Sequence, residues 1–168
     1  GLDILAGKSG SGALAELSKE RLEQVRRELM SQAKVYDRVI VDLGAGIQNE
    51  ARVLAASSGI VLVIATDEPT SLTDAYAFIK VTNAQYPGTD IRILVNMAQS
   101  TREGKRTHET LRKACESFLK ISPRLAGIVR ADPKVKDTIR AQSPLLTRHP
   151  NSNAAMDIEA VVKSLLAD

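Results

Sequence analysis

Aromatic and cysteine side chains are scarce in this chain, and both shortages exclude kinds of site. The sequence has no Trp and only 3% aromatic residues, so it lacks the stacking surfaces expected of a protein that binds single-stranded nucleic acid. The single cysteine, Cys115, excludes an internal disulfide and a cysteine-rich zinc site. We therefore expect no specific nucleic-acid partner, a reducing cytoplasmic location, and a structural thiol at Cys115.

Long apolar runs are absent as well. The longest, Ile60 to Ala65, is far shorter than the roughly 18 residues of a membrane span, so membrane contact is not evident in this chain. The net charge is +3, divided into −2 over residues 1–85 and +5 over residues 86–168. The basic stretches in the second half are most simply solvated helix faces. With 43% apolar and 26% charged residues, we expect one compact domain over residues 1–168.

Short apolar runs alternate with amphipathic stretches along the chain. This pattern predicts an α/β fold with a doubly wound, mainly parallel sheet and helices on both faces. Apolar residues at three- and four-residue spacing mark helices around residues 22–29, 72–79 and 158–166. Ser18 is a predicted helix cap, and Ser71 with Asp74 fits a capping box. The predicted strands are Leu2–Ala6, Val39–Leu43, Ile60–Thr66, Ile91–Met97 and Leu125–Val129.

A glycine cluster, residues 7–12, follows the first predicted strand, where a phosphate-binding loop would lie. In the pattern G-x-x-x-x-G-K-[ST], Ala13 and Leu14 occupy the positions of the lysine and the hydroxyl residue. The alternative register through Lys8 and Ser9 fails because Leu2 stands where its first glycine belongs. We interpret the cluster as a strand-to-helix connection. Anion binding by its backbone amides is the alternative.

Two polar side chains follow predicted strands and could carry nucleotide chemistry. Asp42 ends an apolar run and precedes Gly44 and Gly46, which is the arrangement of a Walker B strand, whose carboxylate holds hydrated Mg²⁺. A simple strand-to-helix turn explains the same residues equally well. Asn96 follows another strand, and its carboxamide offers a donor and an acceptor to a purine edge. Turn capping is the alternative for Asn96.

The same segments carry a family resemblance. Residues 42–47 (DLGAGI), 67–76 (DEPTSLTDAY) and 94–98 (LVNMA) resemble, in this order and spacing, the MinD/ParA family of ATPases. Within that family they are most similar to the flagellar-number regulators called FlhG or FleN. The similarity continues through residues 125–132 and 142–145. It implies a P-loop NTPase-like fold, ATP and Mg²⁺ as ligands, an ATP-dependent dimer, and a flagellar assembly or regulatory protein as partner.

The resemblance also implies roles for individual residues. Asp42 matches the magnesium-associated Walker B aspartate, which acts through water, and Gly44 and Gly46 match the switch II turn. Asn96 matches the asparagine that recognises adenine. Asp132 falls in the loop beside the base. These five are the predicted nucleotide-binding residues, with Asp42 as the metal residue and no catalytic residue in this chain alone.

The lysine-containing P-loop of the family lies on a first strand that has no counterpart in this sequence. We therefore expect a fragment of a FlhG-like ATPase that alone is inactive and binds neither ATP nor Mg²⁺ tightly. By the same resemblance, we expect the full-length protein to hydrolyse ATP and to lie at the membrane periphery. A sheet without its central first strand has unpaired edges, which predicts self-association. The alternatives are a non-catalytic α/β interaction module and a ParA- or CpaE-like positioning protein.

Overall fold

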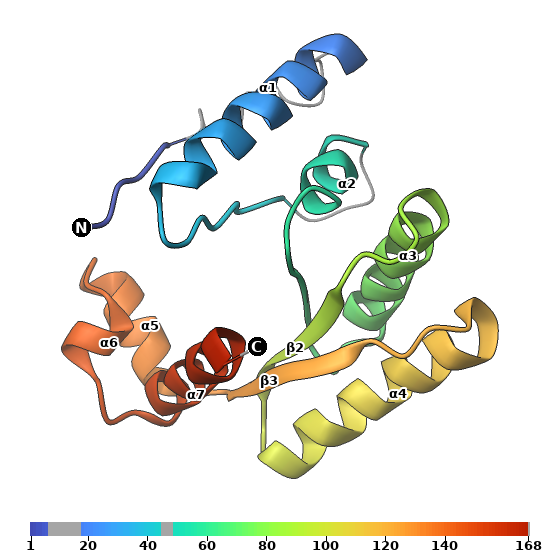
Figure 1. Ribbon diagram of the computed structural model, residues 1–168. Helices are drawn as coiled ribbons and strands as arrows, with labels where there is room; N and C mark the ends of the chain where they lie inside the picture. Colours follow the sequence, from blue (N-terminus) through green and yellow to red (C-terminus); the bar gives the residue numbers. More distant parts are fainter. Residues whose placement is uncertain (7–17, 45–48, 168) are drawn as a thin grey trace. The chain divides into compact units, whose positions relative to one another are not determined.

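The computed structural model describes residues 1–6, 18–44 and 49–167 (Figure 1). It divides into two compact units, residues 1–58 and residues 59–168. Each unit is described by itself below. The expected single domain over residues 1–168 stays a prediction.

The second unit is built on a parallel sheet of three strands in the order β1-β2-β3. These are β1 (Val61–Ala65), β2 (Ile91–Ala98) and β3 (Arg124–Arg130). Val61 of β1 pairs with Ile91 of β2, and the register continues along both strands. The apolar runs predicted the ends of these three strands to within one residue. The reason is that strands covered on both faces of a parallel sheet are nearly uniformly apolar.

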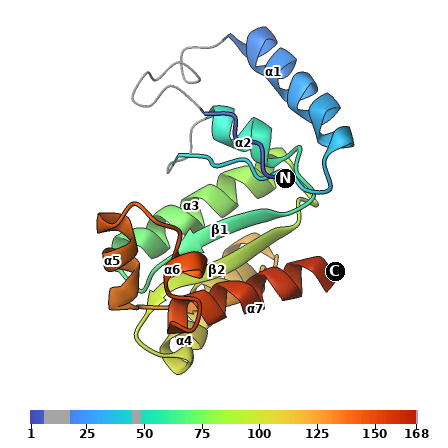
Figure 2. The ribbon, with the colours of Figure 1, turned by 90° about the vertical axis from the view of Figure 1, so that its left-hand side faces the viewer.

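Helices cover both faces of this sheet, as predicted. On one face α3 (Pro69–Gln85) and α4 (Thr101–Leu119) pack side by side against the strands, and on the other α7 (Asn153–Ala167) packs against β3 (Figures 1 and 2). Between β3 and α7 the chain forms α5 (Pro133–Arg140) and the short α6 (Leu145–Arg148). The α/β class is therefore confirmed. None of the helices that the structure describes is long and apolar enough to cross a membrane.

Two glycines allow the helices to approach β3 closely. A Cβ at Gly104 of α4 would collide with the side chain of Ile128, and a Cβ at Gly127 of β3 would overlap Cγ2 of Val161 in α7. Because neighbouring residues of a strand point to opposite faces, Gly127 and Ile128 place the two helices on opposite sides of the sheet.

The predicted structural role of Cys115 agrees with its full burial. Burial raises the pKa of this thiol to about 11, which keeps it protonated and unreactive at neutral pH.

The predicted capping box at Ser71 is wrong. Helix α3 begins at Pro69, with Glu68 as the cap residue, because proline at the first helical position has the right φ and needs no hydrogen-bond acceptor. Ser71 consequently lies inside the first turn. Its hydroxyl accepts a hydrogen bond from the Thr66 amide, at 2.9 Å between N and Oγ, and so joins the helix to the end of β1.

The first unit contains α1 (Lys19–Gln32), a 3-10 turn (Ala33–Val35) and α2 (Asn49–Ala55). The predicted cap at Ser18 is confirmed, since its hydroxyl accepts a hydrogen bond from the Arg21 amide. The glycine cluster at residues 7–12 lies outside the described residues.

The strands predicted at Leu2–Ala6 and Val39–Leu43 are wrong for this structure. Both segments lie outside any strand, and the described residues of the first unit contain no strand at all. Ile40 is 93% exposed. An apolar run becomes a strand only when a neighbouring strand accepts its backbone hydrogen bonds, and nothing among residues 1–6, 18–44 and 49–58 does so here.

Candidate functional site

The carboxyl ends of β2 and β3 bring two of the predicted site residues to one edge of the sheet. Asn96 lies near the end of β2, and Asp132 follows β3 by two residues. The Ala131 amide donates a hydrogen bond to the carbonyl oxygen of Ala98 at 2.8 Å, so the two strand ends are joined directly. In open α/β sheets, ligands bind outside the carboxyl ends of the strands, which makes this edge the candidate site.

Asn96 is half-buried, and its side chain is held by its own backbone. Its Oδ1 accepts a hydrogen bond from the Met97 amide, at 2.9 Å between N and Oδ1. This contact joins the side chain to the next residue of the same strand and orients the carboxamide. It uses one lone pair of Oδ1, so the second lone pair and the Nδ2 donors remain unengaged by other described residues. The adenine-recognition role of Asn96 and its turn-capping alternative both stay predictions.

Asp132 has a role that the sequence did not predict. It caps α5 by accepting a hydrogen bond from the Lys134 amide at 2.9 Å, and its other oxygen accepts from the Ala154 amide in the first turn of α7 at 3.2 Å. These backbone hydrogen bonds, of which the one from Lys134 has the largest effect, hold the pKa of the Asp132 carboxyl below its usual range. Asp132 thus connects the starts of two helices to the end of β3.

The end of β3 is fastened to α7 a second time. The Arg130 guanidinium binds the Asp157 carboxylate through Nε at 2.8 Å and Nη2 at 2.9 Å, and the Arg130 amide donates to the same carboxylate. With Asp132, this ion pair fixes α7 relative to the carboxyl edge of the sheet. The hydrogen-bonded pair Arg130–Asp157 spans 27 residues of sequence, so no local pattern could have revealed it.

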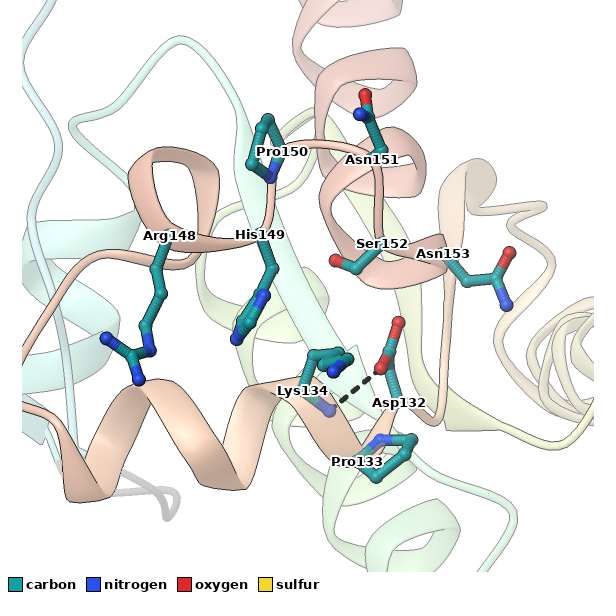
Figure 3. Close-up of a pocket in the computed structure, with 9 residues that line it drawn as sticks. All are labelled: Asp132, Pro133, Lys134, Arg148, His149, Pro150, Asn151, Ser152 and Asn153. Carbon is teal, nitrogen blue, oxygen red and sulfur yellow. Dashed lines mark hydrogen bonds between the residues drawn. The ribbon is translucent and has the colours of Figure 1, made fainter.

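A pocket of about 600 Å³ opens beside Asp132 (Figure 3). The side chains of Arg148 and His149 point from its rim toward α5 in that view. There Asp137 accepts hydrogen bonds from Arg148 Nε at 2.8 Å and from His149 Nε2 at 2.7 Å. The hydrogen bond from Arg148 has the largest effect, and together with that from His149 it lowers the pKa of Asp137 to about 2. The residues that line the pocket are 132–134 and 148–153.

The other predicted site residues belong to the first unit. Asp42 is exposed in a segment without strand pairing, and Gly44 has open space where a Cβ would lie. Gly46 lies outside the described residues. Among the residues that the structure describes, no three His, Cys, Asp or Glu side chains gather in a group that could hold a metal ion. The metal role of Asp42 and the switch role of the glycines therefore stay predictions.

Two bacterial proteins are similar to this chain over nearly its whole length. The antiactivator FleN of Pseudomonas aeruginosa is 30% identical over 165 residues, which cover 98% of this chain and 59% of FleN. The flagellum site-determining protein YlxH of Helicobacter pylori is 27% identical over 169 residues, covering 99% of this chain and 56% of YlxH. The chain thus spans less than two thirds of either relative. No protein-family model matches it.

Solved structures show the same fold. A ParA family ATPase from Chlorobium tepidum superposes with a TM-score of 0.70 at 19% identity, covering 94% of this chain and 60% of that protein. The septum site-determining protein MinD from Pyrococcus horikoshii, in complex with Mg-ADP, superposes with a TM-score of 0.65 at 19% identity. That match covers 86% of this chain and 55% of MinD.

Proposed function

Because the chain belongs to the MinD/ParA family of ATPases, we propose that it recognises the base of an adenine nucleotide as part of a switch that regulates flagellar number or placement. The similarity to YlxH, a flagellum site-determining protein, supports the flagellar part of this proposal. The carboxyl edge of the sheet supports the part about the base.

The Asn96 carboxamide is the observation that carries the proposal. It lies at the end of a central strand, it is oriented by the Met97 amide, and it keeps a donor and an acceptor unengaged by described residues. Adenine presents a matching pair, the N6 amino group as donor and N7 or N1 as acceptor. Guanine presents O6, an acceptor, where adenine has its amino group. A fixed carboxamide of this kind can therefore distinguish the two bases.

ATP and Mg²⁺ are the ligands that the family implies, and the residues present fit them in part. The exposed carboxylate of Asp42 is an oxygen ligand of the kind Mg²⁺ accepts beside water and phosphate. When bound, Mg²⁺ would neutralise charge on the phosphates. Residues 7–14 supply no lysine and hydroxyl in a P-loop register, so we propose that this chain alone binds ATP weakly and does not hydrolyse it.

A test of base recognition needs no phosphate loop. Adenosine and guanosine are titrated into the isotope-labelled chain, and the chemical shifts of the Asn96 side-chain amide are followed by NMR. We expect adenosine to bind more tightly than guanosine, and Asn96→Ala to remove this preference. Asn83→Ala is the matched control, because Asn83 lies near the end of α3 that precedes β2, at the opposite edge of the sheet.

Equal affinities of the wild-type chain for the two nucleosides would contradict adenine recognition. Absence of any perturbation at Asn96 up to the solubility limit would overturn base binding at this edge and favour the non-catalytic interaction module.

We further propose that the chain self-associates through β1, the strand at one edge of the sheet. In the second unit β1 pairs with β2 alone, and its Leu62 and Ile64 side chains are 38% and 51% exposed. An apolar strand with an unpaired edge recruits another strand.

We also propose a cytoplasmic location for the protein, on the basis of the buried free thiol of Cys115.

A further inference from the structure

The end of β2 contains a β-bulge. Val95 pairs with Ile128 and Ala98 pairs with Arg130, so two residues of β2, Asn96 and Met97, stand opposite a single residue of β3. Met97 has a φ of +57°, in the left-handed region that residues other than glycine and asparagine rarely adopt. Bulges of this kind redirect side chains and are frequent beside functional sites.

The bulge determines which side chain leaves the core. In a regular strand Met97, two residues after the buried Val95, would point to the same buried face. The extra residue instead gives the buried position to Ala98, which is 5% exposed, and leaves Met97 59% exposed beside Asn96. A large apolar side chain is thus held out of the core at the edge where the base is proposed to bind, at the cost of an unfavourable backbone conformation.

We propose that Met97 is a nucleotide-binding residue that packs its thioether side chain against the face of the purine whose edge Asn96 reads; this rests on the proposed function. The two roles share one local structure, because the Met97 amide that orients the Asn96 carboxamide belongs to the residue that supplies the apolar contact. An unbranched, polarizable thioether suits the face of an aromatic ring. Such a contact is worth about 2- to 10-fold in affinity.

Methionine methyl groups provide a direct readout. The chain has three methionines, Met30, Met97 and Met156, so selective ¹³C labelling of their methyl groups gives three NMR signals. Met30 and Met156 are exposed to a similar extent, 45% and 47%, and serve as internal controls. On titration with adenosine, we expect an upfield ring-current shift of the Met97 methyl signal, with the other two signals unchanged.

A pair of glycine variants separates the side chain from the backbone. Met97→Gly removes the thioether and keeps a backbone that accepts positive φ, so the bulge persists. Lys120→Gly is the matched control, since Lys120 also has a positive φ, of 59°, and ends α4 before β3, away from the carboxyl edge. We expect Met97→Gly to weaken adenosine binding about 2- to 10-fold and Lys120→Gly to leave it unchanged.

The outcomes distinguish this inference from the function on which it rests. If adenosine shifts the Asn96 side-chain amide but not the Met97 methyl, or if Met97→Gly binds as the wild type does, the inference is overturned and base recognition by Asn96 stands. If neither signal moves, both are overturned. A shift of all three methyl signals indicates non-specific contact and also overturns the inference.

Discussion

Replacing Thr82 with valine should stabilise the second unit. Thr82 lies on the buried face of α3, in the same core as Ile79, and is completely inaccessible to solvent. Its hydroxyl is the one buried side-chain polar group among the described residues without a hydrogen-bond partner. A buried polar group with no partner loses its hydrogen bonds to water on folding and gains nothing in return.

The size of the effect follows from this loss. An unsatisfied buried polar group costs about 1 to 3 kcal/mol. Valine places a methyl group where the hydroxyl was, and its helix propensity is close to that of threonine. We take the lower end of the range. Thr82→Val should therefore raise the free energy of unfolding by about 1 kcal/mol and the melting temperature by about 4 °C.

Urea unfolding, followed by circular dichroism, measures this change, and Thr107→Val is the matched control. Thr107 is also buried on a helix, but its hydroxyl donates to the Glu103 carbonyl oxygen at 3.1 Å, so its replacement removes a hydrogen bond and should not stabilise the protein. If Thr82→Val destabilises the protein, or if the two variants are equal, the Thr82 hydroxyl has a partner in solution and the reasoning is wrong.

Three further outcomes are expected. The Asp137 carboxyl should titrate in an NMR pH series with a midpoint near 2, whereas a midpoint near 4 would contradict its contacts with Arg148 and His149. Because these partners lower its pKa, the stability that Asp137 contributes is fully present at pH values above the ordinary pKa of an aspartate and is lost as the pH falls through about 2. Gly127→Ala should lower the free energy of unfolding by about 1 to 3 kcal/mol because the new methyl overlaps Val161, and adding Val161→Ala should restore part of the loss; full tolerance of the single variant would show that α7 can move away. Sedimentation equilibrium should show self-association through the unpaired edge of β1, and Ile64→Lys should reduce it. A monomer at all concentrations would contradict self-association.

Much of the second unit follows from local sequence patterns. The runs that became β1, β2 and β3 are apolar enough to be recognised because both faces of the sheet are covered. The spacing of apolar residues predicted α3 and α7 for a related reason, since each helix buries one face. The similar apolar run at Val39–Leu43 failed as a strand prediction, because the signal of a strand is local whereas its hydrogen bonds depend on a neighbour elsewhere in the chain.

The candidate site divides in the same way. The sequence by itself placed Asn96 at the end of a strand, because the order of strands and polar residues is a property of the chain. The family resemblance placed Asp132 in the loop beside the base. Only the tertiary structure decided what their side chains do. Asp132 became the connection between α5 and α7 because α7 packs on β3 and brings the Ala154 amide, 22 residues later in the sequence, to the carboxylate. The bulge that holds Met97 outside the core arises from the pairing of β2 with β3, and no pattern within β2 specifies which residue a neighbouring strand will leave unpaired.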